Sequence, residues 1–128
     1  MRSRQGSVLV ETALVMTLLL MLLLGVFEVG RAVLGLNLLT HAVREAARLA
    51  AVDPHLVQDD PDIRAQISAW VAEGGFVVSD SAVRFTPPLQ PGRLIRVSAA
   101  VDVAPLTALV FPGGAIPLQT STVIRYER

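Results

Sequence analysis

The sequence predicts an α+β protein, in which a long N-terminal helix with a membrane-spanning first half carries a small head of one antiparallel sheet and one short helix. Three features predict this fold. Residues 12–27 form an uncharged apolar run, a helical pattern continues from this run to Val52, and residues 94–103 alternate between apolar and polar side chains. The chain has 128 residues, which is enough for a single domain.

Composition and charge exclude several classes of function. Hydrophobic residues make up 52% of the chain, and the mean hydropathy of +0.56 argues against disorder and for a membrane segment. The 11 basic and 11 acidic residues cancel, so the chain has no overall positive field that would hold nucleic acid. No cysteine is present, which excludes disulfides, thiolate metal sites and cysteine nucleophiles.

The apolar run predicts a single membrane span. Counted from Ser7 to Phe27 it covers about 21 residues, or roughly 30 Å of helix, which is the thickness of a bilayer core. A cleavable signal peptide fits less well, because nothing after Phe27 resembles a small-x-small cleavage site. A core helix fits worse still, because about 100 other residues could not enclose it. Arg2 and Arg4 precede the run and favour a cytoplasmic N-terminus.

Glu11 interrupts this span near its start. A carboxylate deep in lipid costs about 2.5–3.5 kcal/mol. One interpretation is that Glu11 reaches back to the interface, which its position allows. The other is that it pairs with a cation: a cut after Gly6 would give Ser7 a free α-ammonium, which could pair with Glu11 of a neighbouring subunit.

The helix is expected to continue beyond the membrane until Asp53-Pro54 ends it. Its outer half is apolar except for one polar stripe, formed by Asn37, His41, Arg44, Glu45 and Arg48. Arg44, Glu45 and Arg48 are either a solvated face with local pairing or a contact with another subunit. Glu28 and Arg31 lie three residues apart just above the membrane, where pairing within or between subunits is expected.

The last 75 residues are predicted to form the head. Asp60-Pro61 starts a helix whose apolar face is Ile63, Ile67, Trp70 and Val71, and Gly74-Gly75 ends it. Strands are expected at 94–103 and 119–126, with shorter candidates at 76–78 and 83–86. Pro91-Gly92 predicts a hairpin turn. The sheet is expected to pack on the upper half of the long helix, since a head this small needs that helix in its core.

Two further segments carry alternatives. Residues 105–117 are unusually apolar for a connection, which indicates either a short helix against the sheet or an exposed contact for a partner. Asp59, Asp60 and Asp62 are expected to cap a helix, because the spacing of a calcium loop is missing. His41 and His55 lack a third ligand at metal spacing. We therefore predict no metal, no cofactor and no catalytic residue.

The motifs together resemble a known family. A basic leader ending in Gly6, with Glu11 five residues after it, is followed by a leucine run, a G-x-x-E-x-G-R stretch at 25–31 and an A-x-R-E-A-A-R stretch at 42–48. This pattern is similar to that of type IV prepilins and, more narrowly, to the TadE-like pseudopilins of the tight-adherence (Flp) pilus. The R-x-E ending at 125–127 fits the same family. Thr12 stands where the family usually has an aromatic residue. Thr17 stands where it often has a helix-kinking proline, which predicts a straighter helix.

The resemblance implies a structural function in pilus biogenesis and adhesion. It implies cleavage between Gly6 and Ser7 by a prepilin peptidase, with Glu11 neutralising the new amine of a neighbour. The expected division is a basic leader (1–6), a transmembrane half-helix (7–28), an extramembrane half-helix (29–53) and a small head (54–128). Expected partners are other pilin subunits, the inner-membrane assembly platform and the lipid bilayer, with the head outside the cytoplasm. The alternative is an unprocessed single-pass scaffold or binding module.

Overall fold

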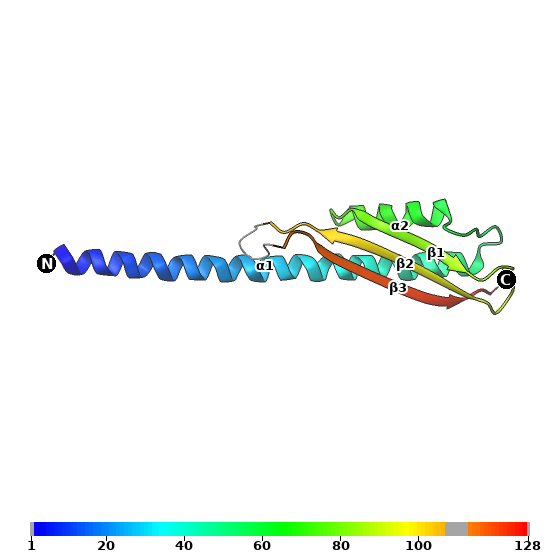
Figure 1. The fold of residues 1–128 in the computed structure, drawn as a ribbon, viewed down its shortest axis with the longest axis horizontal. Coiled ribbons are helices and arrows are strands. Elements are labelled where there is room, and N and C mark those ends of the chain that lie inside the picture. Colours follow the sequence, from blue (N-terminus) through cyan, green and yellow to red (C-terminus); the bar gives the residue numbers. More distant parts are fainter. Residues whose placement is uncertain (1, 107–112, 128) are drawn as a thin grey trace.

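The computed structural model describes residues 2–106 and 113–127 and has the predicted α+β fold (Figure 1). One long helix, α1 (Arg2–Val52), leads to a short helix, α2 (Pro61–Glu73). Three strands follow, β1 (Val78–Phe85), β2 (Leu94–Val103) and β3 (Ile116–Arg125). They form one antiparallel sheet in the order β1-β2-β3. Figure 1 shows the sheet and α2 beside the C-terminal half of α1, while the N-terminal half extends alone.

Helix α1 is uninterrupted over 51 residues, or about 77 Å. Leucine, valine and alanine are its commonest residues, and it contains no proline. Leucine and alanine favour helix strongly. It ends at Val52 because Pro54 disfavours helical backbone at Asp53. The continuous helix expected from the sequence is confirmed.

Helix α2 begins and ends where the sequence predicts. The Asp60 carboxylate accepts hydrogen bonds from the backbone N–H groups of Asp62 at 3.0 Å and Ile63 at 3.3 Å, which caps the helix. Gly74 is its C-terminal cap. Ile63, Ile67 and Val71 are buried, and Trp70 packs partly buried against the core. Asp59 serves the sheet instead: its N–H and its carboxylate bond the C=O and N–H of Val83 in β1.

The sheet corrects two expectations about strand limits. Of the candidates at 76–78 and 83–86, Val78 and residues 83–85 belong to one strand, β1, which runs through Ser79-Asp80-Ser81. Phe76, Val77 and Thr86 lie outside it. Residues 79–81 have weak strand propensity, but pairing with residues 99–101 of β2 holds them in the sheet, with an irregularity between Val78 and Asp80. Strand β3 begins at Ile116 and not at Gln119, so Ile116 and Pro117 belong to the sheet and not to the preceding connection. Residues 107–112 of that connection lie outside the described residues.

The core lies between the sheet and the two helices. Strand β2 matches its predicted limits, and its alternate residues are buried: Ile95, Val97, Ala99, Val101 and Val103. The outer half of α1 presents mostly small side chains to this face: Leu39, Ala42, Val43, Ala46, Ala47 and Ala50. Gly35 continues this surface, because a Cβ at its position would lie 3.2 Å from the ring of Phe76. The small residues let the helix approach the sheet closely, so the upper half of α1 is part of the core, as predicted.

Candidate membrane and assembly site

The N-terminal half of α1 is a candidate membrane span by its length and composition. Its large apolar side chains from Val8 to Phe27 are exposed along the whole segment, with the partly exposed Leu24 the one exception. Two polar side chains within it are satisfied inside the helix. The hydroxyl of Thr12 donates to the carbonyl of Val8, and that of Thr17 donates to the carbonyl of Ala13, each at 2.8 Å. The segment therefore offers lipid few unsatisfied polar groups.

Glu11 lies on the exposed surface of this segment, which no other part of the described chain covers, and it is one helical turn after Ser7. Residues four apart on a helix share a face, so Ser7 and Glu11 point to the same side of α1. Gly6, Ser7 and Glu11 are all exposed. Within the side chains that the structure describes, Glu11 makes no hydrogen bond or ion pair, so its carboxylate is available to a group from another molecule.

Glu28 and Arg31 contact the head, where the connection after β2 reaches α1. The Glu28 carboxylate is only 1% exposed and accepts a hydrogen bond from the backbone N–H of Leu106. The guanidinium of Arg31 donates to the carbonyl of Ala104 at 3.5 Å. Both side chains thus meet the same three residues, 104–106, at the lower end of the sheet.

The polar stripe lies on the solvent-facing side of α1 and has local partners. Arg48 and Glu45 form an ion pair at 3.0 Å between exposed side chains. Arg44 and Glu45 also line a hollow of about 350 Å³ between α1 and α2, together with His41, Trp70 and Glu73. An exposed ion pair of this kind contributes little to stability. The local pairing that the sequence predicts is thus present for Arg48 and Glu45, and a contact with another subunit stays a prediction.

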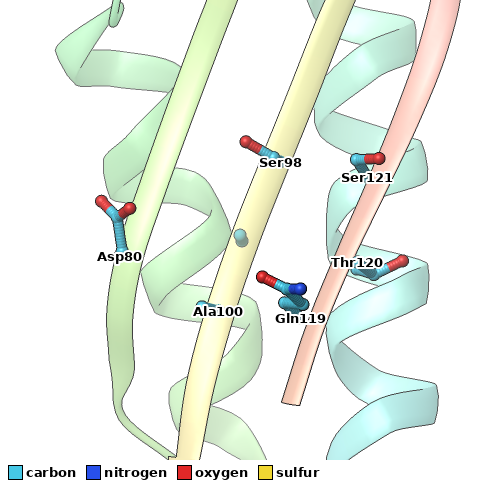
Figure 2. A pocket seen from close by; sticks show the side chains of 7 residues that line it. Asp80, Ser98, Ala100, Gln119, Thr120 and Ser121 are labelled. Atoms are coloured by element: carbon cyan, nitrogen blue, oxygen red, sulfur yellow. The ribbon is translucent and has the colours of Figure 1, made fainter. Parts of the chain in front are cut away.

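The face of the sheet turned away from the helices carries the other hollow of note. Asp80, Ser98, Ala100, Gln119 and Ser121 are among the residues that line a cavity of about 350 Å³ (Figure 2). It contains one carboxylate, hydroxyls and an amide, which do not make an acid–base pair. Over residues 2–106 and 113–127, no three His, Asp or Glu side chains gather in a group that would hold a metal ion.

Sequence reasoning missed the partners of Glu28 and Arg31. It predicts pairing within or between subunits, which stays a prediction. It does not predict their hydrogen bonds to Leu106 and Ala104, which join them to a segment 73 to 78 residues later in the chain. The one sequence signal at that place is the lack of charge between Asp102 and Arg125. This stretch is unusual for a connection, but nothing in it indicates which residue of α1 it would meet.

The fold and these contacts define a class: a protein whose single candidate membrane span, over the described residues, is continuous with the main helix of a small α+β head. Residues 6–48 match the family described as TadE-like protein. This match lies within α1 and covers about a third of the chain, in agreement with the resemblance that its motifs predicted. The match ends before the head, and neither the curated proteins nor the solved structures gave a significant match.

Proposed function

We propose that this chain is a pseudopilin, a structural subunit for biogenesis of a tight-adherence pilus, and not an enzyme. In this proposal a prepilin peptidase cuts the leader between Gly6 and Ser7. The exposed N-terminal half of α1 anchors the precursor in the inner membrane, with the N-terminus in the cytoplasm and the head outside. The assembly platform then brings the subunit together with other pilin subunits, and the subunits contact one another through this exposed half of α1.

The division of α1 into two halves is the observation that supports this function best. The N-terminal half of this continuous helix is exposed and has the length and composition of a membrane span. The C-terminal half packs into the core of the head. A permanent anchor would need no such continuity, because a flexible linker would join span and head equally well. A subunit that packs by its helix needs a rigid rod that fixes the head relative to the packing surface.

Glu11 supplies a physical reason for ordered assembly. A lone carboxylate in a bundle of apolar helices is costly, and a nearby ammonium removes most of that cost. Cleavage after Gly6 would create such an ammonium on Ser7, on the same face of α1 and about one turn away. Pairing between the Ser7 amine of one subunit and Glu11 of the next would fix their axial register.

The test replaces the carboxylate without changing its size. In cells whose only copy is the variant, we expect Glu11→Gln to reach the membrane at the normal level and to be depleted from the sheared pilus fraction. Asp80→Asn is the matched control, because it makes the same carboxylate-to-amide change at an exposed residue of β1 for which no contact with another subunit is proposed. Normal recovery of the Glu11→Gln protein in the sheared fraction would refute the charge-pairing mechanism.

The alternative function is an unprocessed single-pass scaffold that binds partners through its head. The hollow between α1 and α2, with Trp70 and the charged residues Arg44 and Glu45, favours this alternative. An uncut N-terminus on the protein in its native membranes would support the scaffold over the pseudopilin.

A further inference from the structure

The contact between Glu28 and the head coincides with the outer end of the candidate span. A bilayer core is crossed by about 20 helical residues. If the core begins at Val8, it ends at Phe27; if it begins at Thr12, just after Glu11, it ends at Arg31. Both registers place the outer boundary of the core between Phe27 and Arg31. The segment 104–106 is held at that same level by Glu28 and Arg31.

The apolar surface of α1 also continues past Glu28. Leu22, Val26, Val29, Val33 and Leu36 follow one another at intervals of three or four residues, so they form one stripe on the helix. All five are exposed. Three of them, Val29, Val33 and Leu36, lie beyond Glu28 and remain 53%, 52% and 39% exposed, since the head covers a different side of the helix. The lipid-facing surface of the span therefore has no break at Glu28.

The burial of Glu28 is the second observation. A carboxylate in water needs no protein cover, whereas one that faces lipid is costly unless it is covered and hydrogen-bonded. Glu28 is 1% exposed, and a backbone N–H of the head donates to it. This cover is what a carboxylate at a lipid boundary requires.

The residues that make the cover are themselves suited to lipid. Leu106 bonds Glu28 through its backbone, while its side chain is 54% exposed. It belongs to a stretch without any charge from Val103 to Ile124. Exposed apolar side chains at the level of the headgroups partition into the interface.

We propose that the lower end of the head, residues 104–106, rests in the outer interfacial layer of the bilayer, with the Leu106 side chain in contact with lipid. The occupant of this surface is the membrane, which makes it a second lipid contact besides the span. The contact sets the height and tilt of the head, and the head shields Glu28 from lipid. This inference rests on the proposed membrane span.

The test uses the absence of cysteine in the chain, so that one introduced cysteine carries one environment-sensitive fluorophore. Full-length Leu106→Cys is compared with Leu94→Cys, whose native side chain is similarly exposed (60%) but lies at the opposite end of β2, beside Arg125. Leu18→Cys marks the middle of the span. The proteins are reconstituted at low density in phosphatidylethanolamine–phosphatidylglycerol vesicles that contain no brominated lipid, lipid brominated near the headgroup, or lipid brominated near the end of the acyl chains.

We expect brominated lipid to quench the label at 106, with a blue-shifted emission, and to leave the label at 94 unchanged. The label at 18 should be quenched by lipid brominated near the end of the acyl chains. A label at 106 that behaves like the label at 94, while the label at 18 is quenched, would overturn the inference and leave the span intact. A label at 18 that escapes quenching would overturn the span and the proposed function with it.

Two further readouts separate lipid contact from a protein partner and from an altered head. A label at 106 shielded from both brominated lipid and aqueous iodide would show a protein partner, such as a second copy, and would overturn lipid contact. Val33→Cys, on α1 itself, tests the boundary independently of how the head folds, and we expect its label to be quenched. An unquenched label at 33 would overturn the proposed position of the boundary.

The covering of Glu28 is tested in the Leu106→Cys protein. Glu28→Ala should make the label accessible to iodide, because the Leu106 N–H loses its acceptor and the segment is released from α1. Glu28→Gln keeps an acceptor for that N–H and should leave the label shielded. Equal accessibility in both variants would contradict the covering role.

Discussion

The hydroxyl of Tyr126 donates a hydrogen bond to the backbone carbonyl of Asp53 at 3.1 Å, joining residues 73 positions apart. The next residue repeats the contact, because the N–H of Glu127 donates to the carbonyl of Ala51 at 3.0 Å. The last carbonyls of a helix have no partner within the helix. The C-terminal residues of the chain thus satisfy the end of α1 and fix β3 along it.

Removing the Tyr126 hydroxyl should weaken the head measurably. The side chain is buried, so Tyr126→Phe leaves the Asp53 carbonyl without this donor, and we expect a loss of about 1 kcal/mol in the free energy of unfolding. Denaturant unfolding in detergent micelles, followed by Trp70 fluorescence, measures this loss. An unchanged midpoint would show that the hydrogen bond contributes nothing.

Glycines at two positions of α1 should respond in opposite ways to the same substitution. At Gly35 a larger side chain must enter the contact with Phe76 and Val103, so Gly35→Leu should cost about 1–3 kcal/mol. Nothing lies within 4 Å of a Cβ at Gly30, so Gly30→Leu should be neutral or stabilise the helix by up to about 1 kcal/mol. The same micelle unfolding experiment compares them. Equal effects would show that α1 does not pack closely at Gly35.

The cap of α2 provides a third prediction. Asp60 is buried, and its carboxylate also accepts from the N–H of Val57 at 3.3 Å, so Asp60→Ala should destabilise the head by about 1–2 kcal/mol. Asp60→Asn keeps an acceptor oxygen and should lose much less. If both variants unfold at the same denaturant concentration, the cap is not what stabilises this helix.

Elements with local signals could be predicted from the sequence. The alternation of residues 94–103 fixes one buried face, and Asp60-Pro61 is a strong helix start, so β2 and α2 have the predicted limits. Strand β1 could not be delimited in this way. Its Ser79-Asp80-Ser81 segment lacks strand formers, and only its pairing with β2 makes it a strand.

The candidate site also contains residues with a local sequence signal and residues whose contacts depend on the fold. Gly6, Ser7 and Glu11 are recognisable because their spacing is local and resembles a family motif. The contacts of Glu28 and Arg31 with residues 104–106 depend on how the head folds back along α1, and no pattern near residue 28 encodes a partner 78 residues away. The close contact at Gly35 could not be predicted either, because the Phe76 ring that lies beside it comes from another part of the chain.

The proposed cut site makes a fourth prediction. Gly6 has no side chain, and a peptidase that requires glycine before the scissile bond should not accept a branched residue there. We expect Gly6→Val to reach the membrane with its leader retained, while Gly30→Ala, a glycine change elsewhere in α1, is processed normally. A Gly6→Val protein whose mature mass equals that of the unsubstituted protein would refute the cut site.

The central claim is that the chain is a processed pilus subunit, and the N-terminus of the protein from its native membranes tests it most directly. Intact mass and N-terminal sequencing should find a chain that begins at Ser7 and lacks the six-residue leader. An intact N-terminus at Met1 with the full mass would contradict processing. It would also remove the Ser7 amine as the proposed partner of Glu11.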